Sequence, residues 1–224
     1  MWLTVLCAAV VPGLAADAKL TEALARMDKV SANFRSLSAD MQVVSHMEQI
    51  NEDDSQSGSI LVKRPKPKDL HVKLTISRPE EKVAVTDGSK VDVYYPRSGE
   101  QQKLELGHKK TLVDMIHTLG FGGGSRELQS AYDVKLGGTE TVAGESTTRL
   151  ELTPKSPDLL EQWKKIELWI SDKEGYTAQQ KFYEVAKSYM LITYSKVHLN
   201  PDIPDSAFKL EVPKGTKRAN LNKK

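Results

Sequence analysis

The side chains that most often carry chemistry are scattered along this sequence and do not form a known catalytic pattern. The five histidines have neither the i, i+4 spacing nor the glutamate of a zinc-protease helix; they are His46, His71, His108, His117 and His198. No G-x-S-x-G sequence offers a serine nucleophile. The sequence therefore predicts no catalytic residues, no metal site and no cofactor, and we expect a protein that is not an enzyme.

Two further clusters of residues with chemical potential have simpler interpretations. The adjacent carboxylates at 52–54 and at Glu80-Glu81 lie in polar loops, where no burial is expected to shift a carboxyl pKa. The glycine-rich stretch from Gly120 to Ser125 resembles a dinucleotide-binding loop, but Ser125 stands where the third glycine belongs and a helical pattern precedes it. A hinge is the better interpretation of this stretch.

The composition fits one folded domain without a strongly charged surface. The 224 residues are 39% hydrophobic and 28% charged, and 32 Lys and Arg residues against 30 Asp and Glu residues give a net charge of +2. This balance provides no field that would hold nucleic acid or another polyanion.

An apolar segment at the start of the chain is typical of a secretory signal. The apolar run over residues 2–11 is followed by three alanines up to residue 18, and it is shorter than the roughly 20 apolar residues that a bilayer-spanning helix needs. We expect residues 1–18 to be cleaved on export to the periplasm; a buried N-terminal helix is the alternative. The single cysteine, Cys7, lies in this segment, so the mature chain would form no disulfide.

Two hydrophobic periods predict the elements of the mature chain. Between Lys19 and Leu37 apolar residues recur every three or four positions, which predicts an amphipathic helix. After Ser38 the period becomes two, which is typical of antiparallel strands with one buried face. Predicted strands lie at residues 41–46, 59–63, 70–77, 83–85, 91–93, 104–106, 132–136, 150–152, 166–170, 180–184, 190–199 and 208–212. The fold class is therefore α+β and mainly β, with one curled sheet of about 11–12 strands.

Shorter segments complete the expected organisation. A second helix is predicted at Thr111–Leu119, followed by a flexible joint of glycines, and a third short helix within Pro154–Lys165. The basic segment after Pro213 predicts a mobile tail. We expect one domain at residues 19–213 and a flexible tail at residues 214–224. Trp169 has the opposite parity to its apolar neighbours, so it lies either outward or on a strand covered on both faces.

Three short motifs in a fixed order carry a family resemblance. They are G-x-[apolar]-x-V-K-R-P at Gly58–Pro65, the turn Thr86-Asp87-Gly88, and an apolar strand ending in Tyr94-Tyr95-Pro96. Together with the closing segment NPDIPDSAFKLEVPKGTK, they resemble the LolA-like periplasmic carriers of outer-membrane lipoproteins. The likeness covers nearly the whole mature chain.

The resemblance implies an architecture, a function and a set of site residues. It implies an open half-barrel with a helical lid over a hydrophobic cavity, in a monomer that carries acylated lipoproteins from an inner-membrane ABC transporter complex to an outer-membrane acceptor. Arg64 would be the latch that holds the lid closed through hydrogen bonds to its backbone. The implied cavity lining is Met27, Val72, Leu74, Ile76, Val83, Val85, Val91, Val93, Leu112, Met115, Ile116 and Leu119.

The residues themselves leave other interpretations open. The same aliphatic side chains could form a filled core, and Arg64 could be a surface arginine at a strand end. This chain has aliphatic residues such as Val72 and Leu74 where well-studied carriers place aromatic ones. The cargo could therefore be another lipid, such as a glycolipid or a fatty acid, or the scaffold could bind only other proteins as a regulator.

Overall fold

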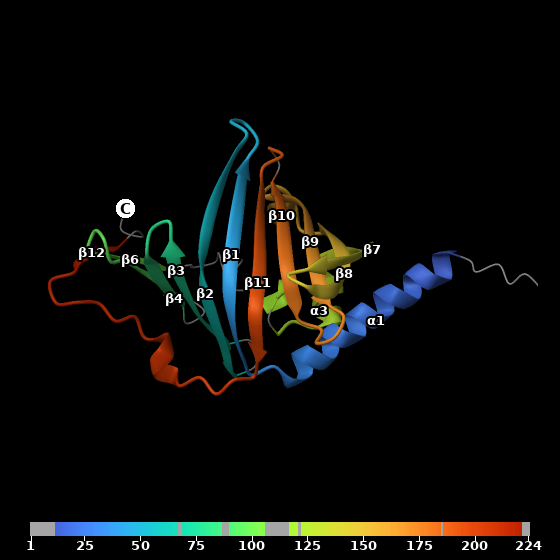
Figure 1. The fold of residues 1–224 in the computed structure, drawn as a ribbon, viewed down its shortest axis with the longest axis horizontal. Helices are drawn as coiled ribbons and strands as arrows, with labels where there is room; N and C mark the ends of the chain where they lie inside the picture. Colours follow the sequence, from blue (N-terminus) through green and yellow to red (C-terminus); the bar gives the residue numbers. More distant parts are fainter. Residues whose placement is uncertain are drawn as a thin grey trace, which may run out of the picture.

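One strongly twisted sheet of twelve strands dominates the computed structural model, which describes residues 12–66, 69–86, 90–105, 117–120, 122–184 and 186–220 (Figure 1). The strands are β1 (Ser36–Met47), β2 (Glu52–Lys66), β3 (Asp69–Arg78), β4 (Lys82–Thr86), β5 (Lys90–Tyr95), β6 (Glu100–Glu105), β7 (Tyr132–Val142), β8 (Glu145–Pro154), β9 (Trp163–Ser171), β10 (Thr177–Glu184), β11 (Tyr189–Leu199) and β12 (Lys217–Asn220). The predicted fold class, a mainly β protein with an open sheet, is confirmed.

The sheet consists of two meanders joined by one long-range strand pair. Its order is β12-β6-β5-β4-β3-β2-β1-β11-β10-β9-β8-β7, so β1 through β6 and β7 through β11 each run in chain order. The meanders meet where β1 pairs with β11, with Leu37 opposite Leu199 and His46 opposite Tyr189. Because β6 and β7 lie near opposite edges, the chain between them connects the two ends of the sheet.

In the described part of the chain the helices are few and lie beside the sheet. The main one, α1 (Pro12–Asn33), begins and ends earlier than predicted, and the short helices are α3 (Ser125–Ala131), α4 (Pro157–Leu160) and the 3-10 turn η1 (Asp205–Phe208). The predicted end at Leu37 is wrong because the apolar spacing continues past the helix into buried Phe34 and Leu37, which belong to the sheet half of the core. Among the described residues, no helix has both the length and the hydropathy to cross a membrane.

The helices α1 and α3 and the helical residue Leu119 cover only part of one sheet face. On that face Leu24 and Met27 of α1 pack with Leu119, with Leu128 of α3, and with buried side chains of strands β8 to β10. A second cluster lies over strands β1 to β3 and β11 and contains Phe34 together with strand residues alone. We call the face that α1 and α3 contact the inner face, and the opposite one the outer face.

The C-terminal part of the chain differs from prediction in two places. Residues 208–212 do not form a strand: Phe208 ends η1, and the next residues are irregular. They belong to a strap, residues 200–216, that includes η1 and runs along the outer face (Figure 1). Within the predicted tail, Lys217–Asn220 pairs in parallel with β6 and covers the edge of the sheet. Four mainly polar residues on an edge strand give no alternation, so the sequence has no signal for β12.

Trp169 lies on the outer face of a strand that is covered on both sides. It is opposite Gln179 in the register, whereas its neighbour Leu168 is opposite Gln180 on the inner face. Its side chain is nevertheless buried against Val142 and Ala178. The indole Nε1 donates a hydrogen bond to Glu140 at 3.0 Å.

Candidate functional site

The strand register brings aliphatic side chains from five strands together on the inner face. Leu37 is opposite Val62, which in turn is opposite Val72. On the next strands Leu74 is opposite Ala84, and Ala84 is opposite Val93. Because paired residues of an antiparallel sheet point to the same side, these side chains form one continuous apolar surface.

This apolar surface is packed at its centre and partly open around it. Val62 and Val72 are fully or almost fully buried, with exposed fractions of 0% and 2%. Other inner-face aliphatics are only half-buried, and we call this set the open stripe: Val43, Leu74, Val91, Val93 and Ile192. An aliphatic surface that a fold leaves half-exposed is suited to contact another apolar group.

Seven of the twelve predicted lining residues lie on the inner face or in its core. Val72, Leu74 and Ile76 share one side of β3, and Val91 and Val93 join them through β4. Met27 and Leu119 are buried in the cluster that joins α1 to strands β8 to β10. Leu112, Met115 and Ile116 lie outside the described residues.

For Val83 and Val85 the structure differs from the expectation. They are opposite Thr75 and Lys73, so their side chains lie on the outer face. The inner-face residue of this strand is Ala84. The alternation in Val83–Thr86 reveals which residues share a face, but the register of the β3–β4 pair decides which face meets the interior.

Arg64 ties three main-chain carbonyl groups together at the end of α1. Its guanidinium donates hydrogen bonds to the carbonyl of Gly122 at 3.2 Å, of Ser31 at 2.8 Å and of Phe34. The Phe34 ring lies beside the guanidinium, 5.5 Å from its central carbon. Gly122 belongs to the glycine joint that follows the helical residues 117–119, so Arg64 connects β2, α1 and this joint. A guanidinium can do this because its five N–H donors point in fixed directions.

Two residues of α1 reinforce this junction, and the sequence analysis did not single them out. Ser31 Oγ donates to the same Gly122 carbonyl at 2.6 Å. Asp28 accepts hydrogen bonds from the backbone N–H and the hydroxyl of Ser125, both at 2.7 Å, at the start of α3. Polar residues on one side of a predicted amphipathic helix look like solvent-facing residues, so only their partners reveal the role.

Gly122 has to be glycine for the junction to form. Its φ of +118° lies in a region that residues with a side chain rarely adopt. An added Cβ would also lie close to two side chains, 3.3 Å from the Phe34 ring and 3.4 Å from the Arg64 guanidinium. The joint therefore brings its backbone close to Arg64 and fixes the carbonyl that Arg64 binds.

Fold and site together define a class of protein: an open β half-barrel whose inner face is apolar and is covered in part by helices clamped through an arginine. A family model described as "Outer membrane lipoprotein carrier protein LolA" matches residues 32–211. The chain belongs to the LolA family of outer-membrane lipoprotein carrier proteins.

Similar sequences carry the same description. The outer-membrane lipoprotein carrier protein of Pseudomonas entomophila is 27% identical over 198 residues, which cover 88% of this chain and 84% of the relative. The carrier protein of Cupriavidus pinatubonensis is 35% identical over 92 residues, or 41% of this chain and 40% of the relative.

Solved structures share the fold at low sequence identity. MucB has a TM-score of 0.56 at 14% identity over 87% of this chain and 63% of its own, so this chain spans less than two thirds of MucB. An uncharacterised conserved protein from Thermus thermophilus has a TM-score of 0.55 at 12% identity, over 90% of this chain and 99% of that one. Lipoprotein LppX of Mycobacterium tuberculosis has a TM-score of 0.51 at 12% sequence identity, over 84% of this chain and 100% of that one.

Proposed function

We propose that this protein is a periplasmic, non-enzymatic carrier that holds the acyl chains of lipoproteins against its apolar inner face and escorts them from the inner to the outer membrane. The observation that supports this best is the open stripe, a set of aliphatic side chains from four strands that the fold leaves half-exposed on the inner face. Membership of the LolA family supports the choice of lipoproteins as cargo. An inner-membrane ABC transporter complex would supply the cargo and an outer-membrane acceptor would receive it.

The energetics of acyl chains explain what such a carrier has to provide. Removing a chain from water is worth about 0.8 kcal/mol per methylene, or roughly 12 kcal/mol for sixteen carbons. Contact with Leu74, Val91 and Val93 offers apolar surface of this kind without directional bonds, so chains of different length can bind and leave.

Release requires a second state with different affinity for cargo. In the proposal, the Arg64 hydrogen bonds to Ser31 and Gly122 stabilise the closed state, in which α1 and the glycine joint lie against the sheet. Cargo would bind when these bonds open, and their reformation would help to expel it at the acceptor. Ser31 and Asp28 would strengthen the same closed state.

A carrier of another lipid is the second candidate, and the chemistry of the stripe favours considering it. The stripe is formed by valine, leucine and isoleucine; on the same face Tyr194 is buried and Tyr95 is half-buried at the end of β5. A mainly aliphatic surface would also suit a fatty acid or the chains of a glycolipid.

Identification of the bound material separates the two candidates. The protein would be purified from periplasm under mild conditions and its bound molecules identified by mass spectrometry. Acylated peptides support the lipoprotein carrier, and free lipid supports the second candidate. A protein that is recovered without either, and that does not take up acylated peptide when mixed with it, would contradict both. The matched control is the Leu74→Glu variant, in which a charge occupies the open stripe.

A further inference from the structure

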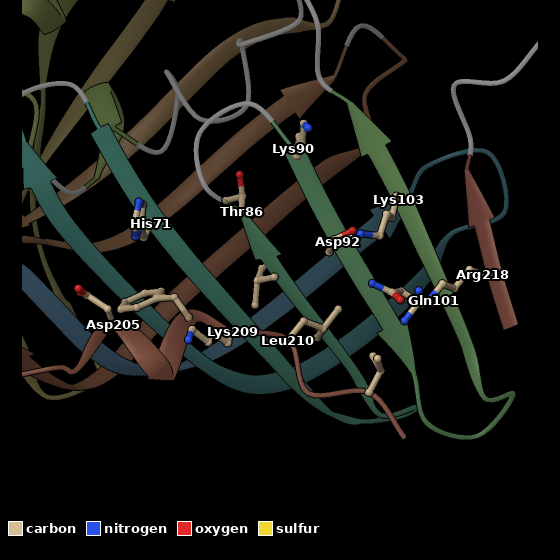
Figure 2. Close-up of a pocket in the computed structure, with 13 residues that line it drawn as sticks. His71, Thr86, Lys90, Asp92, Gln101, Lys103, Asp205, Lys209, Leu210 and Arg218 are labelled. Atoms are coloured by element: carbon tan, nitrogen blue, oxygen red, sulfur yellow. Dashed lines mark ion pairs between the residues drawn. The ribbon is translucent and has the colours of Figure 1, made fainter. Parts of the chain in front are cut away.

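A pocket on the outer face lies between the C-terminal strap and strands β3 to β6, away from the apolar inner face. It has a volume of about 550 Å³, within the range of small-molecule sites. Figure 2 shows strap residues Asp205 and Lys209 on one side and Gln101 and Lys103 of β6 on the other. We call it the strap pocket.

Hydrogen bonds and ring contacts fix the strap over this pocket. Lys63 Nζ donates to the carbonyl of Ile203 at 2.7 Å and pairs with Asp205 at 2.6 Å. The ring of Phe208 packs edge-on against His71, 6.0 Å between centroids. The parallel pairing of Arg218 with Gln101 holds the far end of the strap at the sheet edge. The pocket is therefore walled by a tethered segment and a sheet.

Positive charge predominates in the lining. Four lysine or arginine side chains and two aspartates line the pocket. Both aspartates have ion-pair partners. Asp205 pairs with Lys63, which does not itself line the pocket, and the Asp92 carboxylate lies 3.6 Å from Lys103 Nζ. In the described part of the chain, neither Lys209 nor Arg218 has an ion-pair partner. An anion beside Gln101 would therefore gain a charge-assisted contact with Arg218, and Lys209 adds positive charge on the strap side of the pocket.

Gln101 adds an observation that is independent of charge. This side chain is 5% exposed, and its buried Oε1 has no hydrogen-bond partner among the described residues. A buried amide oxygen without a hydrogen-bond donor destabilises the fold, so a ligand that supplies a donor is favoured. Gln101 lines the pocket beside Arg218, so a hydroxyl or amide N–H on a bound molecule could supply the donor after a small movement of the amide.

The remaining lining is apolar. Val85, which the register places on the outer face, lines the pocket together with Phe208 and Leu210 of the strap. Such a site combines an anion-binding side, one hydrogen-bond acceptor and an apolar wall. These are the features of an amphiphilic ligand site rather than of a simple ion site.

We propose that the strap pocket binds an organic phosphate, a phosphate ester whose hydroxyl-bearing part reaches Gln101 while its phosphate contacts Arg218. A free polyol phosphate and the glycerophosphate headgroup of a lipid share this chemistry. The site lies on the face opposite the open stripe, so it is separate from the proposed acyl-binding surface.

Calorimetric titration with sn-glycerol 3-phosphate tests the proposal on the purified protein. Binding is expected, with an affinity that falls as salt is added. Arg218→Gln should weaken it about tenfold, which corresponds to the loss of one charge-assisted hydrogen bond. Lys214→Gln removes the same charge from an exposed position of the strap outside the pocket and should change the affinity less than about twofold.

Three further arms decide the chemistry and its source. Gln101→Leu should lower the affinity for glycerol 3-phosphate but leave the affinity for inorganic phosphate unchanged. Binding to phosphatidylglycerol vesicles but not to phosphatidylcholine vesicles, lost in Arg218→Gln and without binding of the free ester, would assign the site to a lipid headgroup. The proposal is overturned if neither the ester nor the vesicles bind, if inorganic phosphate binds as well as the ester, or if Arg218→Gln and Lys214→Gln behave alike. Uptake of acylated peptide should be the same in all three variants, so failure here leaves the carrier proposal intact.

Discussion

At the scale of single residues, Arg64 shows how one side chain can join elements that are distant in the sequence. Its backbone N–H donates to the carbonyl of Arg35 at 2.8 Å, and its guanidinium reaches α1 and the glycine joint. Hydrogen bonds from a charged donor contribute about 1.5–3 kcal/mol each when partly buried. That is enough to bias a two-state equilibrium about tenfold or more.

We predict that Arg64→Leu takes up acylated cargo but transfers it poorly. Without the guanidinium the closed state loses its hydrogen bonds, so less free energy is available to expel the acyl chain. The measurement is transfer of a labelled lipoprotein from inner-membrane to outer-membrane vesicles, and we expect a decrease of about tenfold. The control is Arg35→Leu, which removes an exposed arginine nearby. Normal transfer by Arg64→Leu would remove this residue from the mechanism.

His46 gives a prediction about pH. A hydrogen bond to Asp53 at 2.8 Å raises the pKa of the His46 imidazole above 6.5, with a further contact to Glu48 at 3.3 Å. Because the pKa is higher in the folded state, the stabilisation is fully present below the unfolded pKa of about 6.5 and is lost as the pH rises through the folded pKa.

The check is an NMR titration of the His46 ring protons, which should show a midpoint above 6.5. Asp53→Asn should lower this midpoint, whereas Glu52→Gln, which changes a neighbouring carboxylate with no contact to the ring, should leave it nearly unchanged. An equal midpoint in the protein and in Asp53→Asn would contradict the assignment.

The sequence indicated which kinds of residue form the site but not all of their partners. The KRP motif was sufficient, through the family resemblance, to single out Arg64. Asp28 and Ser31 could not be found because their partners, Ser125 and Gly122, lie 97 and 91 residues further along the chain. Gln101 looked like an ordinary polar strand residue until its burial was known.

At the scale of elements, the alternation of apolar and polar residues predicted where the strands lie. It predicted less well which face of the sheet their apolar side chains occupy. Leu70–Ser77 reads as a half-buried strand and is part of β3, with Val72 buried as expected. Val83 and Val85 have the same alternation but face outward, because strand-to-strand register depends on turn geometry. The helix α3 follows a glycine and has one buried residue, Leu128, which is too weak a pattern to predict.

The inner-face assignment of β3 predicts a contrast between adjacent substitutions. Leu74→Glu places a carboxylate on the open stripe and should lower acyl-peptide affinity by about tenfold or more, since an unpaired charge beside an acyl chain is unfavourable. Thr75→Glu places the same group on the outer face and should leave affinity unchanged. Binding of a fluorescent acylated peptide measures both. Equal affinities, in variants shown by circular dichroism to be folded, would mean that β3 does not contact the cargo.

At the scale of the whole molecule, the two hydrophobic clusters of the inner face differ in how completely they are covered. Over β8 to β10 the side chains of α1, Leu119 and α3 complete a closed core. Over β1 to β5 the aliphatic surface remains partly open. Stability can therefore come from one half of the sheet while the other keeps apolar surface available for a ligand.

Ligand-induced stabilisation tests this division. A palmitoylated peptide at a hundred times its dissociation constant should stabilise the fold by about 2.7 kcal/mol and raise its melting temperature by about 5–10 °C. The same peptide without the acyl chain should have no effect. Differential scanning calorimetry provides the measurement, and equal melting temperatures with the two peptides would contradict an acyl-binding face.

The pairing of β1 with β11 also has a consequence for how the chain reaches its folded state. These strands come from opposite ends of the chain, with Leu37 opposite Leu199, and contacts between such distant segments form slowly. As synthesis proceeds from the N-terminus, the meander β1–β6 is complete while β11 is still missing. The twelve-residue edge of β1 then exposes unpaired backbone groups, which another chain can pair with. We therefore expect aggregation through this edge to compete with assembly, and protection of β1 until residue 199 is available should raise the yield of folded protein.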